Sequence, residues 1–208
     1  MFFAISFVIE EEIVPASQGS TAPSVAERPM RADAQRNYNR LVAAAREAFT
    51  RSGSDAALED VARAAGVGIG TLYRHFPDRL ALIEAVYRDG VDGLSGRAET
   101  LASTKPPLEA LELWFSDFVA YAATKQVLIH VLAEAIGKDS ELLTHSRQVI
   151  TDSVTSLLSR AQSAGVVRAD VIPSDLLRLV GGCTMMAGLE DDQQQRLLRV
   201  VLDGLRAS

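Results

Sequence analysis

Cysteine is almost absent from this chain of 208 residues, because Cys183 is the single residue of its type. One cysteine excludes an intrachain disulfide and a metal site built from several cysteines. A chain without disulfides suits a reducing compartment, so we expect a cytoplasmic protein. Histidine is scarce as well, with three residues and no metal-spaced pair among them. The sequence therefore predicts no metal site.

Aromatic residues are also few, at 6% of the chain, and positive charge is in deficit, with a net charge of −6. This acidic surplus argues against indiscriminate coating of nucleic acid. Hydrophobic residues reach 48%, and a chain of this length buries roughly two thirds of its unfolded surface. Such a composition suits a helical core rich in Leu, Val and Ala, arranged as one large domain or as a small and a larger one.

Apolar runs long enough to span a bilayer are missing. The run over residues 1–9 is too short, lacks the basic start of a signal peptide, and is followed directly by three glutamates, so we expect no membrane insertion. Residues 1–30 otherwise favour a disordered arm. The alternative is an arm that packs on a partner. If a protein truncated to begin at Met30 kept the same melting temperature and DNA affinity, this alternative would be excluded.

From residue 31 onward, apolar residues recur with the period of a helix. Gly53 ends the first helical segment, Pro77 breaks the third, and Asp78 can cap a fourth. We expect glycines 90, 93 and 96 to loosen the end of that fourth helix. Residues 127–136 are apolar nearly all round, which predicts burial on most sides. No strand pattern of useful length occurs, so the predicted fold class is all-α.

The most informative segment spans residues 58–78. A short amphipathic helix with its inner face at Leu58, Val61 and Ala62 is followed by Gly66 and then by a second short helix to about His75. This is the layout of a helix-turn-helix, which places its second helix in the DNA major groove. Gly66 stands where the turn requires a positive φ. DNA reading is therefore the first functional hypothesis.

The same segment, AGVGIGTLYRHFPDRLAL over residues 65–82, closely resembles the signature of the TetR family of transcriptional regulators, with a match over about residues 35–87. The resemblance implies an all-helical homodimer with a DNA-binding N-terminal domain and a larger C-terminal domain that binds a small molecule. Most members are repressors that a ligand releases from an operator. The matching positions are Gly66, Val67, Gly70, Leu72, Tyr73, His75, Phe76 and Leu82.

We accordingly expect an arm over residues 1–30, a helix-turn-helix domain over 31–78, and a ligand-binding and dimerisation domain over 79–208. Leu72 and Phe76 lie four residues apart and should anchor the second helix inward. Arg74 can reach a guanine or a phosphate, and a basic residue matches Arg79 in the family. The predicted contacts with double-stranded DNA are Gly68, Ile69, Gly70, Thr71, Tyr73, Arg74, His75 and Arg79.

Not every contact has one interpretation, and three positions depart from the family pattern. Tyr73 and His75 are predicted phosphate contacts, with packing of the helix ends as the alternative. Gly68 replaces a better helix cap. Ile69 replaces a polar or basic residue and cannot hydrogen-bond a base, so readout there should be apolar or absent. Leu80 stands where an acid is common, which changes the charge at the start of the fourth helix.

Residues 91–208 are similar to the C-terminal half of the SbtR-like branch of actinobacterial regulators, a looser match that rests on Trp114, Phe118, Tyr121, residues 123–125, Gly165, Arg168 and Asp170. An apolar bundle with a few polar groups is a suitable place for a small-molecule effector. The alternative for each candidate is ordinary core packing. The predicted ligand-binding residues are Trp114, Phe118, Tyr121, His130, Met185 and Met186.

The last two helices are the predicted dimer interface. Gly181 and Gly182 permit close helix approach, and an apolar stripe follows near the end of the chain. A partner chain would cover this stripe in a four-helix contact, while packing on the chain's own bundle is the alternative. The stripe consists of Leu197, Leu198, Val201, Leu202 and Leu205.

An enzyme and an interaction module are the two alternative classes of function. No nucleophile elbow, phosphate loop or dinucleotide motif occurs in a fitting context, so we expect neither an enzyme nor a cofactor. The other alternative is a helical interaction module that does not bind DNA. A protein that retains no DNA from a mixed pool at low salt would favour this alternative. Repression and activation both remain open, because the position of the operator decides between them.

Overall fold

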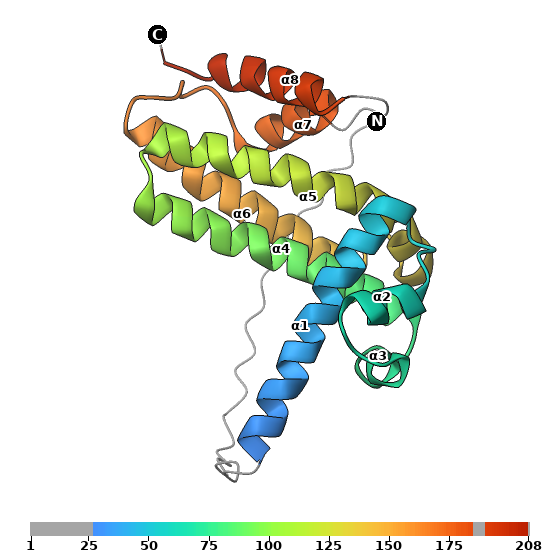
Figure 1. Cartoon of the computed structure of the whole chain (residues 1–208). Helices are drawn as coiled ribbons and strands as arrows, with labels where there is room; N and C mark the ends of the chain where they lie inside the picture. The colour runs from blue at the N-terminus through green and yellow to red at the C-terminus, as the bar shows by residue number, and fades with distance from the viewer. Residues whose placement is uncertain (1–26, 185–189, 208) are drawn as a thin grey trace, which may run out of the picture.

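The computed structural model describes residues 27–184 and 190–207, and within these ranges it contains eight α-helices and no strand (Figure 1). One isolated antiparallel bridge joins Val167 and Arg206. The predicted all-α fold class is confirmed. The helices are α1 (Glu27–Ser52), α2 (Leu58–Ala64), α3 (Ile69–His75), α4 (Arg79–Thr104), α5 (Pro107–Ile136), α6 (Glu141–Ser163), α7 (Pro173–Thr184) and α8 (Asp191–Asp203).

The three N-terminal helices form one end of the molecule, and α4, α5 and α6 run side by side in the remainder (Figure 1). Helix α1 contacts α2, α4 and α5, while α7 and α8 pack on one another and on α5. One cluster of buried apolar side chains runs through both parts of the molecule. Helix α1 begins at Glu27, so residues 27–30 of the predicted arm belong to this helix, and residues 1–26 lie outside the described part.

Helix α4 does not loosen at its glycines, and this expectation was wrong. The helix continues through Gly90, Gly93 and Gly96 to Thr104. Val91 and Leu94 lie between these glycines and are buried, because α4 packs on both α5 and α6. Burial of an amphipathic face outweighs the roughly 1 kcal/mol that each glycine costs a helix.

Helix α5 bends by 53° between Pro107–Ala122 and Thr124–Ile136. Its second half was expected to be buried on most sides, and most of its apolar residues are buried or packed against the core, which leaves a narrow stripe exposed. Leu128 and Leu132 are buried, whereas His130 and Glu134 are exposed. In the part of the chain that is described, no single helix is long and apolar enough to cross a membrane, although the two halves of bent α5 pass that test together.

The apolar stripe near the C-terminus lies largely within its own chain. Leu198, Leu202 and Leu205 are buried, since α8 packs on α7 and α5. The expectation that a partner covers this whole stripe is therefore wrong, and packing on the chain's own bundle is what the structure contains. The exposed apolar side chains of these two helices are instead Leu179 on α7 and Val200 on α8.

Candidate nucleic-acid interface and ligand cavity

A hydrogen-bonded glycine turn joins α2 to α3. Gly66 has a φ of 67°, as the sequence predicted. The amide of Gly66 donates to the carbonyl of Arg63 at 3.1 Å, and the amide of Val67 donates to the carbonyl of Ala62 at 3.0 Å. These two bonds form a Schellman motif, which satisfies the last carbonyls of α2 and sets the direction in which the chain leaves it. Helix α3 then begins within two residues.

Helix α3 is held by two apolar side chains on its inner face. Leu72 and Phe76 are buried, as expected from their spacing, and the Phe76 ring lies 5.1 Å from that of Tyr38 on α1. After α3, Asp78 caps α4, since its carboxylate accepts a hydrogen bond from the amide of Ala81 at 2.8 Å. The short helix is thus held to the domain by its buried inner side and its C-terminal end.

Seven of the eight predicted DNA contacts lie along α3 or at its N-cap, and those that are not packed on the protein define the exposed face of α3. Thr71 and His75 are half-buried, and the His75 ring meets the Tyr38 ring edge-on at 6.2 Å. His75 therefore packs on α1 while part of its ring remains accessible. No side-chain hydrogen bond caps α3 at Gly68, in line with the weak cap that the sequence predicted. The exposed members of this face are Gly68, Ile69, Gly70, Tyr73 and Arg74.

Arg79, the eighth predicted contact, has a structural partner that sequence reasoning missed. Its Nη1 donates to the carbonyls of Ser54 at 2.8 Å and of Ala56 at 2.6 Å. The half-buried side chain therefore joins the start of α4 to the turn between α1 and α2. A guanidinium has five N–H donors, so this role leaves other donors for a phosphate.

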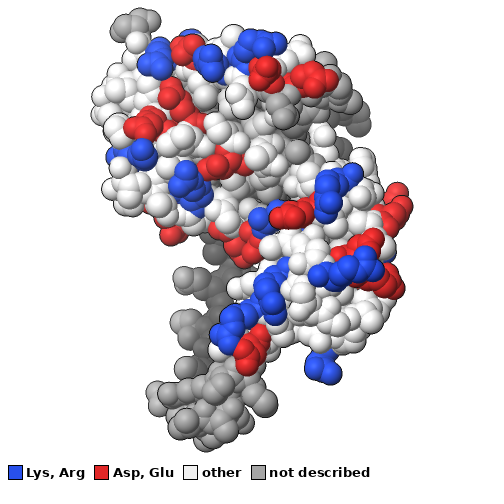
Figure 2. All heavy atoms as spheres, in the orientation of Figure 1, with Lys and Arg blue, Asp and Glu red and all other residues white. Residues whose placement is uncertain are grey.

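Basic side chains do not form a single patch at this end of the molecule. On the face drawn in Figure 2, arginine side chains over α1–α3 are interspersed with acidic ones. Residues 31–90 contain nine arginines and eight acids, which agrees with this mixture. This mixture of charges does not provide a general positive field for phosphates.

A cavity of about 570 Å³ lies where α1, α4 and α5 meet. Tyr121 of α5 is the one predicted ligand-binding residue of the described part that lines it. Tyr87 and Gly90 of α4 form the facing wall. Sequence reasoning missed most of this site, although the closely spaced glycines of α4 were a signal that side-chain volume is reduced there.

Trp114 and Phe118, two other predicted ligand contacts, belong to the core between α4 and α5. The fully buried indole of Trp114 donates from Nε1 to the carbonyl of Leu94 at 3.0 Å. The Trp114 and Phe118 rings stack with centroids 5.6 Å apart. His130 is exposed and does not line the cavity, and Met185 and Met186 lie outside the described residues. Of the four candidates within the described ranges, the structure thus brings one to the cavity.

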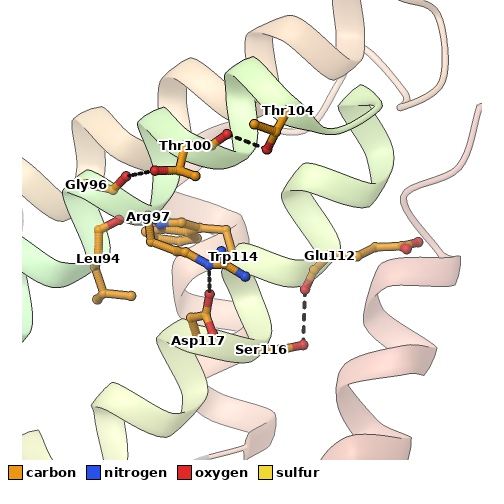
Figure 3. Close-up of polar contacts among 9 residues, drawn as sticks. All are labelled: Leu94, Gly96, Arg97, Thr100, Thr104, Glu112, Trp114, Ser116 and Asp117. Carbon is orange, nitrogen blue, oxygen red and sulfur yellow. Dashed lines mark hydrogen bonds and ion pairs between the residues drawn. The ribbon is translucent and has the colours of Figure 1, made fainter.

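Ion pairs cross the walls of the cavity and connect its helices. Arg46 of α1 pairs with Asp89 of α4. Arg97 of α4 reaches Asp117 of α5 at 2.8 Å, beside Trp114 (Figure 3). Both pairs are partly exposed, so each contributes at most about 1 kcal/mol to stability. Their position matters more, because all four charged residues line the cavity and the two pairs link α4 to α1 and to α5.

A second hollow, of about 790 Å³, lies between α5 and α8. Glu112 of α5 and Arg206, just beyond α8, line it and form an ion pair at 3.2 Å. None of the predicted ligand-binding residues in the described ranges lines this hollow.

Comparison with known proteins accounts for both parts of the chain. Residues 41–86 match the family of bacterial regulatory proteins of the tetR family, and residues 106–207 match the C-terminal domain of SbtR-like transcriptional regulators. The E. coli K12 transcriptional regulator UidR is 25% identical over 192 residues, which cover 86% of this chain and 93% of UidR.

Two solved structures extend the similarity. The TetR regulator SCO0520 from Streptomyces coelicolor is 39% identical, with a TM-score of 0.74 over 82% of this chain and 99% of that one. A TetR regulatory protein from Mycobacterium vanbaalenii is 35% identical, with a TM-score of 0.70 over 86% of this chain and 100% of that one. With its N-terminal helix-turn-helix and helical C-terminal half, the chain belongs to the TetR family of transcriptional regulators.

Proposed function

We propose that this regulator acts as a homodimeric repressor, bound to a palindromic DNA operator and released by a small amphipathic molecule. The observation that carries the proposal is the exposed face of α3, whose inner side is fixed by Leu72 and Phe76. A short helix held in this way can enter the major groove without rearrangement. Such a protein acts in the cytoplasm and needs neither a metal ion nor a catalytic site.

Each residue on the α3 face has a role in this proposal. Gly68 and Gly70 carry no side chains, so the backbone can approach the DNA closely. Tyr73 contacts phosphate and positions the helix, whereas Arg74 reaches a base edge or a phosphate. Ile69 covers a thymine methyl group. Thr71, His75 and Arg79 complete the predicted contacts at the edges of the face.

The proposed dimer uses the outer surface of α7 and α8. Leu179 is 49% exposed and Val200 is 70% exposed, unusual values for large aliphatic side chains. A Cβ on Gly182 would have no neighbour within 4 Å, which leaves room for a partner helix. Two copies joined here would present two α3 helices, which read half-sites about 34 Å apart or a multiple of that distance.

Selection from a random duplex library tests the proposal, followed by salt titration of the selected sequence. A palindromic consensus and a steep fall in affinity with salt are expected from a dimeric sequence reader. No enrichment by a folded dimer, together with no retention of DNA at low salt, would favour a helical interaction module instead. A reporter with the selected operator at the promoter then distinguishes repression from activation.

A further inference from the structure

One wall of the α1–α4–α5 cavity contains the buried hydroxyl group of Tyr121, with the Tyr87 phenol beside it. Tyr121 lines the cavity, and its hydroxyl oxygen is buried but makes no hydrogen bond of normal geometry with the described residues. A buried polar group without a partner is costly, so it marks a position that a ligand or water must satisfy. Burial, together with the adjacent Tyr87 phenol, raises the pKa of Tyr121. The hydroxyl therefore stays protonated and can donate a hydrogen bond.

A cation without a counter-ion follows one helical turn later. Lys125 lies four residues after Tyr121, beyond the bend of α5, and lines the same cavity. The other two cations of the cavity, Arg46 and Arg97, are paired with aspartates, whereas Lys125 forms no ion pair with any described residue. Burial and the positive charge of Arg147 lower the pKa of Lys125. An anion placed here would relieve both effects.

The remaining acid of the lining, Asp92, does not offset Lys125. Asp92 is exposed and remains solvated, while Lys125 is half-buried. A cationic ligand would therefore gain little from Asp92, because pairing of exposed charges contributes at most about 1 kcal/mol. An anionic ligand gains more from Lys125, since charge pairing is stronger with an ammonium group that burial has partly desolvated.

Part of the remaining lining is aromatic and apolar. The Tyr87 and Tyr121 rings lie 6.4 Å apart, and Val86, Leu94 and Leu128 complete the apolar lining. On the α4 side, Gly93 leaves open space, because a Cβ there would meet no atom within 4 Å. Aromatic walls and a missing side chain favour a planar ring over a branched aliphatic group.

We propose that this cavity binds an aromatic carboxylic acid. Its carboxylate accepts hydrogen bonds from the Tyr121 hydroxyl and the Lys125 ammonium group, and its ring lies along Tyr87 and the glycine-lined side of α4. Binding of the acid stands independently of the DNA, but its role as the releasing effector rests on the proposed function.

Isothermal titration of the full-length protein with matched probes tests the proposal. The probes are phenylacetate, indolylacetate and naphthylacetate, each compared with its neutral amide. At least one acid should bind roughly tenfold or more tightly than its amide, because hydrogen bonds to charged groups exceed neutral ones by about that factor. Lys125→Met and Tyr121→Phe should each reduce this ratio. Lys138→Met, at an exposed lysine, is the matched control and should leave it unchanged.

Three results would overturn the proposal: no acid binds below about 1 mM, the amides bind as well as the acids, or the Lys125→Met protein keeps the wild-type ratio. Thermal melting of each variant verifies that it is folded. Operator binding without any probe is measured on the same samples. A protein that binds its operator but shows no preference for acids contradicts only this inference, whereas a protein that prefers acids but binds no operator contradicts the proposed function.

Discussion

Gly90 of α4 lies directly against the ring of Tyr121 on α5. A Cβ at position 90 would stand 2.9 Å from both Cδ2 and Cε2 of that ring, closer than carbon atoms normally approach. Gly90 therefore allows the two helices to meet at the cavity wall, where a side chain would displace Tyr121. The contact joins the glycine pattern of α4 to the position of the candidate ligand donor.

Gly90→Ala should be less stable than Gly96→Ala. Both changes gain the helix propensity of alanine, about 1 kcal/mol, but only the first pushes on Tyr121. Such overpacking typically costs about 1–3 kcal/mol. A Cβ on Gly96 has no neighbour within 4 Å, which makes this variant the matched control. Urea unfolding of the two proteins measures the difference, and equal midpoints would contradict the predicted steric contact.

Arg79→Met should destabilise the protein even without DNA. The change leaves the carbonyls of Ser54 and Ala56 without their donor, at a cost of roughly 1–3 kcal/mol. Arg88→Met, at an exposed arginine of the same helix, is the control and should melt like the wild type. If both variants melt alike while only Arg79→Met loses DNA affinity, Arg79 acts mainly as a phosphate contact.

Arg74→Ala should reduce DNA affinity while leaving the stability of the protein nearly unchanged. The side chain is exposed, so the free energy of unfolding should change by less than about 0.5 kcal/mol. Affinity for the selected operator should fall by about 1–3 kcal/mol with a relaxed preference at one base if Arg74 reads guanine. A uniform loss and a salt slope reduced by about 1 would assign it to a phosphate. Fluorescence anisotropy at several salt concentrations measures both, and unchanged affinity would remove Arg74 from the interface.

Ile69 gives a prediction about the DNA rather than the protein. If its exposed side chain covers a thymine methyl group, replacing that thymine by uracil should weaken binding by about 0.8 kcal/mol, the worth of one buried methyl group. The Ile69→Ala protein should no longer distinguish the two operators. Scanning uracil through one half-site by anisotropy finds the position, and a scan without any effect would mean that Ile69 reads nothing.

Val200→Arg should weaken the dimer. The residue is 70% exposed in the single chain, so a charge there is tolerated by the fold but not by an apolar interface. Sedimentation at several protein concentrations should detect a shift toward monomer at unchanged melting temperature. Ala135→Arg, at an exposed position on α5, is the control. A Val200→Arg protein that dimerises normally would place the interface elsewhere.

The helix-turn-helix was predictable from sequence because its determinants are local. The positive φ at Gly66, the buried pair Leu72 and Phe76, and the cap at Asp78 each depend on neighbours within a few residues. Helical periodicity then predicted the remaining helices, with α4 as the exception. Its glycines are weak helix formers, and only packing against α5 and α6 keeps the helix continuous.

The cavity could not be predicted in the same way, since its parts come from distant positions. Arg46 and Asp89 are joined across two helices, and a helical pattern does not reveal which exposed faces will meet. Trp114 and His130 illustrate the same limit. Both suited a pocket by residue type, but the structure buries the first in the core and exposes the second.

The C-terminal end of helix α1 contacts residues that line the cavity. Its 26 residues extend about 39 Å, and near its C-terminal end the Thr50 and Thr124 hydroxyls lie 3.0 Å apart, while Arg46 pairs with Asp89. A tilt of about 5° at this end would displace the far end by about 3 Å. If a small molecule bound in the cavity tilted α1, the displacement would therefore be largest at the end of the helix that lies farthest from the cavity.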